Sequence, residues 1–120
     1  MSHVPFFSIL ILCWNSQAYL RRCLQSLQEQ TFKDFEVWLA DNGSDEPVDW
    51  EMLKDYPGLE LHVQRWEHNT GFAKGNNALA SLARGQHLVL LNSDAFPQAD
   101  WLEVIYQAAG RYPGCSFASR

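Results

Sequence analysis

The chain alternates between short, almost continuously apolar stretches and segments whose apolar residues recur at helical spacing. The stretch Phe6 to Cys13 predicts a strand buried on both faces, which is typical of the centre of a parallel sheet. In the next segment Leu20, Leu24 and Leu27 predict an amphipathic helix that Ser16 can cap. The same patterns predict further strands at 35–40, 59–66 and 86–91. They predict helices at 50–56, at 71–83 and around Trp101, Ile105 and Ala108. The helix at 71–83 has Phe72, Leu79 and Ala83 on one face, and Gly85 is its expected stop signal.

This order of elements predicts the fold class. Strand and helix alternate four times, which favours an α/β fold with three layers and a parallel sheet. We expect the strand order 3-2-1-4, with helices on both faces and the switch in strand order between the first and fourth strands. The final residues 113–120 resemble the approach to another strand.

Composition and charge narrow the possible classes of function. The 120 residues are 47% hydrophobic and 19% charged, which predicts one globular domain spanning residues 1–120. The net charge is -5, and the basic residues do not cluster beyond Arg21 and Arg22, so a nucleic-acid partner is excluded. An anionic ligand would need backbone amides, helix ends or a metal ion to offset the negative charge of the protein.

The cysteines and the longest apolar run point to a cytoplasmic protein. Cys13, Cys23 and Cys115 are odd in number and form no CxxC motif, so we expect reduced, packed thiols rather than disulfides or a zinc site. The apolar run from Phe6 to Trp14 is much shorter than the roughly 20 residues that a membrane span requires.

Polar residues gather where the predicted strands end. They occur at 14–16, 41–45, 69–71 and 92–94, directly after or shortly after a strand. The carboxyl ends of parallel strands meet at one edge of the sheet, where ligands bind in open α/β folds. The sequence therefore predicts a polar site at this edge.

Each polar segment also has a purely structural explanation. Residues 41–45 can form a turn, and residues 69–71 can cap a helix. The poor helix formers at 75–77 indicate that another group approaches this helix closely. Asp94 can cap the next helix or bind a hard divalent cation. Trp38, Trp50, Trp66 and Trp101 are expected to pack in or beside the core, and the four histidines are too scattered to predict a metal site.

Several common motifs are absent from the sequence. No GxGxxG motif follows the first strand, which argues against a dinucleotide-binding fold. The Walker motif GxxxxGK[ST] and the GxSxG elbow are also absent, so P-loop and serine-hydrolase chemistry lose their main support.

Taken in order, the polar segments and the strands before them resemble a known family. The matching stretches are SILI with Trp14–Asn15, FEV with DNGSD at 41–45, NTGFAKGNN at 69–77 and LLNSD at 90–94. They are similar to the amino-terminal, nucleotide-binding half of family-2 glycosyltransferases with the GT-A fold, especially the rhamnosyltransferase-like members. The resemblance covers about residues 6–110. It implies a Rossmann-like GT-A domain.

The resemblance also implies roles for individual residues. Asp41 matches an aspartate that binds the base of a nucleotide-sugar donor, and Trp14 and Asn15 match the loop that closes over the base and ribose. Asn92–Ser93–Asp94 matches the DxD motif, whose last acid binds Mn²⁺ or Mg²⁺ on the diphosphate. Because Asn92 replaces the first acid, Asp94 is the one charged ligand of this motif. The other donor-binding residues implied are Asn42, Asn69, Gly71, Gly75, Asn76 and Asn77.

The implied reaction transfers a sugar from a UDP-, dTDP- or GDP-linked donor to a glycan or lipid-linked acceptor, in cell-wall or polysaccharide biosynthesis. The protein would lie in the cytoplasm, with a peripheral position at the inner membrane face as an alternative. In this family the acceptor site and general base follow the DxD motif, so we expect a truncated domain that cannot complete transfer alone and that self-associates through its open sheet edge. A non-catalytic α/β module that binds a nucleotide or a protein is the main alternative. A sugar nucleotidyltransferase ranks last, because residues 14–16 lack the glycines and basic residue of that class.

Overall fold

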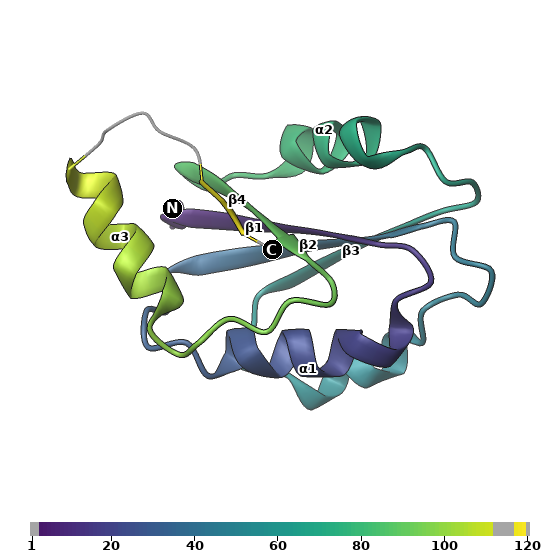
Figure 1. The fold of residues 1–120 in the computed structure, drawn as a ribbon, viewed down its shortest axis with the longest axis horizontal. Helices are drawn as coiled ribbons and strands as arrows, with labels where there is room; N and C mark the ends of the chain where they lie inside the picture. Colours follow the sequence, from purple (N-terminus) through teal and green to yellow (C-terminus); the bar gives the residue numbers. More distant parts are fainter. Residues whose placement is uncertain (1–2, 112–116, 120) are drawn as a thin grey trace.

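The computed structural model describes residues 3–111 and 117–119. The limits of the four predicted strands differ from the observed ones by no more than two residues. In chain order the elements are β1 (Phe7–Cys13), α1 (Gln17–Gln28), β2 (Phe35–Asn42), the 3-10 helix η1 (Trp50–Asp55), β3 (Leu61–Trp66), α2 (Phe72–Leu82), β4 (His87–Asn92), α3 (Trp101–Arg111) and β5 (Phe117–Ser119), as labelled in Figure 1.

The described strands form one parallel sheet in the order β3-β2-β1-β4-β5. Phe7 of β1 lies opposite Phe35 of β2 on one side and opposite His87 of β4 on the other. The predicted order 3-2-1-4 and the switch between the first and fourth strands are therefore confirmed. The short β5 pairs with β4, with Phe117 opposite Val89, in the segment that the sequence indicated as the approach to a further strand.

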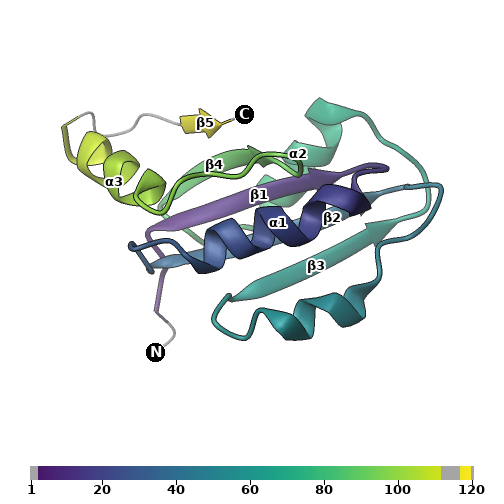
Figure 2. The ribbon, with the colours of Figure 1, turned by 60° about the horizontal axis from the view of Figure 1, so that its bottom comes forward.

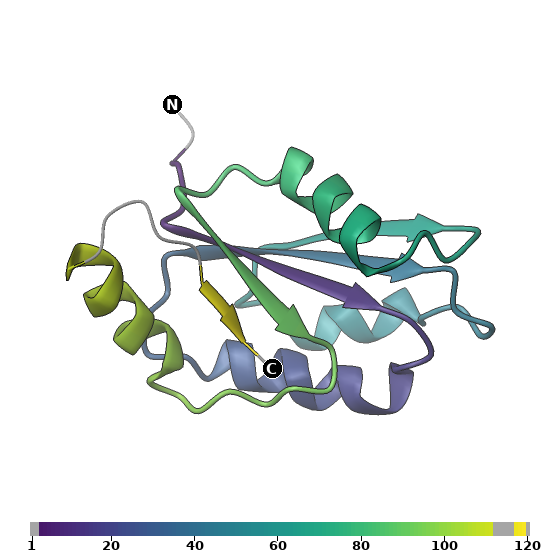
Figure 3. The ribbon, with the colours of Figure 1, turned by 45° about the horizontal axis from the view of Figure 1, so that its top comes forward.

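Helices cover both faces of the sheet. Figures 1 and 3 show α1 and η1 on one face and α2 on the other, and in Figure 2 α1 runs along the sheet in front of β1 and β2. Within the described ranges no helix has both the length and the hydropathy that a membrane crossing requires. The main core lies on the α1 face and includes Phe7, Ile9, Ile11, Leu20, Leu24, Leu27, Val37, Leu39, Val89 and Leu102.

The burial of β1 on two faces explains its continuous apolar sequence. Phe7, Ile9 and Ile11 belong to the core on the α1 face. Leu10, between them, packs with Leu79 of α2 in a smaller core on the other face. In β3, at the edge of the sheet, half-buried residues alternate with exposed ones. The position of a strand in the sheet therefore decides how strongly its sequence pattern shows.

Gly85 has a different role from the predicted helix stop. Helix α2 ends at Leu82, with Ala83 as its C-cap residue in an extended conformation. A Cβ atom on Gly85 would lie 2.5 Å from Ser8 Oγ and 2.6 Å from Ser8 N. Glycine is required here because the connection from α2 to β4 passes directly against the backbone of β1.

Candidate functional site

A cavity of about 490 Å³ opens at the carboxyl edge of the sheet, where the strand arrows of β1 and β4 end in Figure 3. Residues from the loops after β1, β3 and β4 and from the end of β2 contribute to it. The convergence of polar segments that the sequence predicts is therefore observed. The lining residues are Leu12, Trp14, Asn15, Ser16, Tyr19, Asn42, Asn69, Phe72, Asn92, Ser93 and Asp94.

Asn15 connects the loop after β1 to the loop after β2. Its side-chain Oδ1 accepts a hydrogen bond from the Asp45 N–H at 2.9 Å, and its Nδ2 donates to the Asp45 carboxylate at 3.1 Å. Its own backbone N–H donates to Ser44 Oγ at 3.0 Å. The φ of Asn15 is +51°, a left-handed conformation that asparagine tolerates better than most residues. The side chain thus holds two loops together.

Asn42 forms the corresponding connection between β2 and the loop before α2. Its Oδ1 accepts hydrogen bonds from the N–H and the hydroxyl of Thr70, at 2.9 and 3.1 Å. Its Nδ2 donates to Asn69 Oδ1 at 3.2 Å, and that oxygen also accepts the N–H of Gly71 at 2.7 Å. Asn42 is buried. Both polar groups of its side chain therefore hold the loop in place.

Asp41 shapes the loop that follows it. Its Oδ1 accepts the N–H of Ser44 at 3.0 Å, and its Oδ2 accepts the N–H of Val48 at 2.9 Å. The residue is buried and lies outside the 490 Å³ cavity. It lines a second cavity of about 320 Å³ together with Ser44, Arg65, Trp66 and Glu67.

Ser16 connects the loops after β1 and β4. It occupies the N-cap position of α1, as predicted, but its side chain makes no capping hydrogen bond. Instead, Ser16 Oγ accepts a hydrogen bond from the Ser93 hydroxyl at 2.6 Å. Ser16 therefore lies at the predicted N-cap position, but the predicted side-chain cap is not formed.

Asp94 and Asn92 remain free to bind a ligand. Both are exposed and line the 490 Å³ cavity, and within the described residues no hydrogen bond reaches the Asp94 carboxylate. The alternative that Asp94 caps the next helix is wrong, because α3 begins only at Trp101. A carboxylate beside an amide oxygen is a donor set that suits a hard cation such as Mg²⁺ or Mn²⁺.

The remaining predicted site residues lie outside the lining of this cavity. A Cβ atom on Gly75 would lie 2.8 Å from both methyl groups of Leu12, so this glycine lets α2 approach the sheet. Asn76 is buried and donates to the carbonyl of Phe72 at 3.0 Å. Gly71 is the exposed N-cap residue of α2, and Asn77 is exposed on the same helix. The close approach that the sequence indicated at 75–77 is the approach of the sheet to α2.

Two aromatic residues of the cavity were not predicted. Tyr19 is 52% exposed and Phe72 is 66% exposed, and both line the cavity beside Trp14. Helical spacing placed Phe72 with Leu79 on one face, but Phe72 is the first residue of α2 and lies at the edge of the sheet. Its position directly after the polar segment 69–71 is the signal that could have indicated it. By contrast, Trp38, Trp50, Trp66 and Trp101 pack against the two cores as predicted.

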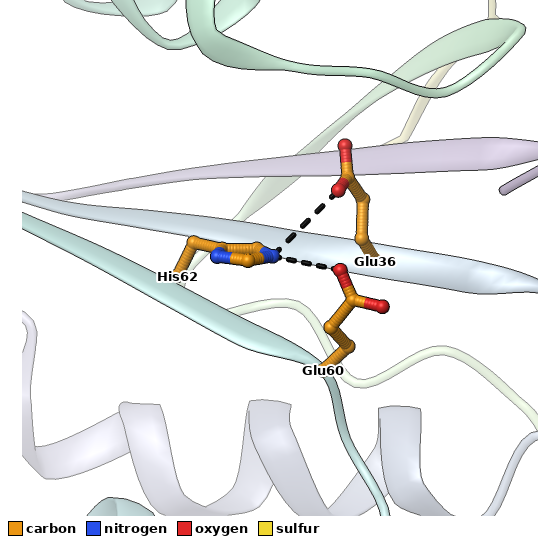
Figure 4. A group of neighbouring side chains, drawn as sticks. All are labelled: Glu36, Glu60 and His62. Carbon is orange, nitrogen blue, oxygen red and sulfur yellow. Dashed lines mark hydrogen bonds and ion pairs between the residues drawn. The ribbon is translucent and has the colours of Figure 1, made fainter. Parts of the chain in front are cut away.

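A second polar cluster, shown in Figure 4, lies near the start of β2 and β3, away from the cavity. Glu36, Glu60 and His62 place ligand atoms within 4.8 Å of one another, a grouping that the scattered histidines did not predict. Arg84, however, donates from Nε to Glu36 at 3.3 Å and from Nη2 to Glu60 at 2.9 Å. The cluster therefore already contains a cation, and we assign it to an ion-pair network.

Glu36 is fully buried at the centre of this network. Burial raises the pKa of its carboxyl group, but hydrogen bonds from the Ser8 hydroxyl and the Arg84 N–H outweigh that effect, and the pKa is lowered overall. The folded chain therefore keeps this carboxylate charged.

The two cysteines that the structure describes in full are free and buried, as predicted. Burial is the main cause that raises the pKa of Cys13 and of Cys23 to about 12. Both thiols are therefore protonated at neutral pH and are not nucleophiles. Cys115 lies outside the described residues.

Comparisons with known proteins identify the family of this chain. Residues 8–120 match the sequence model of the family described as "Glycosyl transferase family 2". Among curated relatives, the chondroitin synthase of Escherichia coli is 31% identical over 107 residues, which is 87% of this chain and 15% of that protein. The chain spans between 15% and 34% of the first three curated relatives.

Solved structures share the fold. The structure of S. aureus TarS in complex with UDP-GlcNAc superposes with a TM-score of 0.77 at 27% identity, over 88% of this chain and 31% of that chain. The mannosyltransferase PcManGT from Pyrobaculum calidifontis, in complex with GDP-Man and Mn²⁺, superposes with a TM-score of 0.71 over 84% of this chain and 33% of that chain. At 21% identity, the second likeness concerns the fold alone.

Proposed function

This chain belongs to glycosyl transferase family 2, and from that premise we propose that it forms the donor-binding half of a metal-dependent glycosyltransferase. The observation that carries this proposal is the turn Asn92–Ser93–Asp94, which presents a free carboxylate to a cavity at the carboxyl edge of the sheet. In open α/β folds this edge is where ligands bind.

We assign Asp94 and Asn92 as the residues that would hold a divalent cation. The cation would supply positive charge to a diphosphate, which a protein of net charge -5 cannot neutralise with its own side chains at this site. The carboxylate of Asp94 and the amide oxygen of Asn92 support the choice of Mn²⁺ or Mg²⁺, both of which prefer oxygen ligands.

The aromatic residues of the cavity would bind the uncharged parts of the donor. Trp14, Tyr19 and Phe72 present exposed rings around the same cavity as Asp94. Rings of this kind pack against nucleobases and against the apolar faces of sugars. The smaller cavity at Asp41 offers Ser44 and Arg65 as polar partners, and we propose that it binds the nucleobase of the donor.

We propose a nucleotide-diphosphate sugar as the donor and a glycan or a lipid-linked molecule as the acceptor. TarS in complex with UDP-GlcNAc supports a UDP-linked donor. PcManGT, which shares the fold, was solved with GDP-Man, so a GDP-linked donor is the alternative. The chondroitin synthase relative supports a role in polysaccharide synthesis. We further propose that the protein lies in the cytoplasm and that it self-associates through the edge of its sheet.

We also propose that these 120 residues bind the donor but do not complete transfer by themselves. Among the described residues that line the 490 Å³ cavity, Asp94 is the one carboxylate, and it would bind the cation. No histidine lines that cavity within the described chain. This lining supports a general base for the acceptor that lies outside this cavity.

The proposal is tested by titrating UDP into the purified chain with and without Mn²⁺. We expect binding to require Mn²⁺, and Asp94→Asn to weaken it by about tenfold to a hundredfold, because a charge-assisted contact contributes roughly 1.5–3 kcal/mol. Asn92→Asp adds a second charged ligand and should strengthen Mn²⁺-dependent binding. Asp100→Asn is the matched control, since Asp100 is an exposed acid of the same loop that does not line the cavity. Metal-independent binding that survives Asp94→Asn would contradict the proposal.

A further inference from the structure

The turn that carries Asp94 has a buried side and an exposed side. The N–H of Ala95 donates to the carbonyl of Asn92 at 3.0 Å, which makes Ser93 and Asp94 the central residues of a tight turn. Ser93 is buried, whereas Asn92 and Asp94 are exposed to the cavity. The buried Ser93 side chain can therefore hold the turn against the protein beneath it.

The anchor of the turn is the first residue before α1. The Ser93 hydroxyl donates to Ser16 Oγ at 2.6 Å. A serine at an N-cap position normally accepts a hydrogen bond from an N–H group of its own helix, which stabilises the helix. Ser16 makes no such bond, so its side chain serves the turn instead of the helix.

A second contact joins the same two elements. The Cys23 thiol of α1 donates a weak hydrogen bond to the carbonyl of Asn92, with an S···O distance of 3.9 Å. Ser16 and Cys23 thus hold the turn from the same helix. Within the described chain, the Ser16–Ser93 hydrogen bond is the shorter of these two links, and it lies next to Asp94.

We infer that Ser16 is a positioning residue for Asp94 and acts through Ser93. The inference rests on the proposed function, in which Asp94 binds a divalent cation. Residues that orient a metal ligand without touching the metal commonly change metal affinity by about tenfold to a hundredfold when they are removed. The Ser16 hydroxyl would thus couple the loop after β1 to the metal ligand of the loop after β4.

The test uses Mn²⁺ alone and the complete, ¹⁵N-labelled chain. Bound Mn²⁺ broadens the NMR signals of nearby amides, so the Mn²⁺ concentration that half-broadens the Asp94 amide measures affinity at this site. We expect Ser16→Ala to raise this concentration by about tenfold. Ser93→Ala removes the same hydrogen bond and should act alike, which provides a second variant if the first does not fold. Ser16→Thr keeps a hydroxyl group and should restore binding.

Ser26→Ala is the matched control, because the Ser26 hydroxyl belongs to the same helix and donates to the Arg22 carbonyl at 2.9 Å, away from the turn. It should leave the Mn²⁺ response unchanged. In an Asp94→Asn background, Ser16→Ala should have no further effect on Mn²⁺ binding, whereas a merely structural role would still lower it.

The outcomes separate this inference from the proposed function. If the wild-type Asp94 amide does not respond to Mn²⁺, the metal site fails and the inference fails with it. In a second outcome, the wild-type amide responds while Ser16→Ala and Ser93→Ala need the same Mn²⁺ concentration as the wild type. That result overturns the inference alone. A loss in Ser16→Ala that Ser16→Thr does not restore also overturns it.

Discussion

At the scale of single residues, the same polar residue types perform two different tasks at this edge of the sheet. Asn15 and Asn42 use their amide groups to hold loops, and Asp41 uses both carboxylate oxygens in the same way. Asp94 and Asn92 carry similar groups but present them to the cavity. Residue type and spacing therefore predict where the site lies, whereas hydrogen-bond partners decide which residues can bind a ligand.

Glu36 provides a prediction at this scale. Glu36→Gln should destabilise the folded chain by about 2–3 kcal/mol at pH 7, because a buried partner of Arg84 loses its charge. The pKa of Glu36 is lowered in the folded chain, so its stabilisation is fully present above the ordinary value of 4.5 and is lost as the pH falls through the folded pKa. Urea unfolding of wild type and variant between pH 7 and pH values below 4.5 measures this difference.

Glu60→Gln is the control for that prediction. Glu60 also pairs with Arg84, but its side chain is about half exposed, so the same chemical change should cost less than about 1 kcal/mol. Equal losses in both variants at pH 7, or a Glu36→Gln effect that does not shrink in acid, would show that the buried carboxylate is not the source of the stability.

At the scale of elements, the sequence predicts most clearly a strand that is buried on both faces. β1 is covered by α1 on one face and by α2 on the other, so nearly every residue in it is apolar and the pattern is plain. The sequence did not predict the exposed position of Phe72 or the link from Ser16 to Ser93. Both depend on where the end of one element meets a loop from another, and hydrophobic spacing within one segment carries no such information.

Gly85 shows how such a meeting constrains one residue. Gly85→Ala should destabilise the chain by about 1–3 kcal/mol, because its Cβ atom would lie 2.6 Å from Ser8 N and 2.7 Å from Phe7 C, and a strand backbone cannot shift easily. Gly58→Ala is the control, since its Cβ atom would come no closer than 3.8 Å to Gln28. Thermal unfolding of both variants checks the prediction, and equal midpoints would mean that β1 can yield at Ser8.

At the scale of the whole molecule, side-chain hydrogen bonds link the loops in the same order as their strands. Asn42 joins the loop after β3 to β2, Asn15 joins the loops after β2 and β1, and Ser16 joins the loops after β1 and β4. The order of these links follows the sheet order β3-β2-β1-β4. The edge that carries the candidate donor site is therefore one connected structure, in which Asn15 is the central link.

Asn15 can be removed from this structure without straining the backbone. Asn15→Gly keeps a left-handed φ of +51° accessible and deletes only the side-chain hydrogen bonds to Asp45. Hydrogen exchange should then speed up at the Asp45 amide, which Asn15 Oδ1 accepts at 2.9 Å. It should stay slow at the Ser44 amide, which donates to Asp41 within its own loop.

Asn15→Ala separates the two contributions of this residue. It loses the same hydrogen bonds and also forces a side chain with a Cβ atom and no local hydrogen bond into the left-handed region, so it should be less stable than Asn15→Gly by about 1 kcal/mol. If the Ser44 amide loses protection together with the Asp45 amide, the loop after β2 does not hold its shape through Asp41 alone. The link through Asn15 would then be needed to form that loop, and not only to join it to its neighbour.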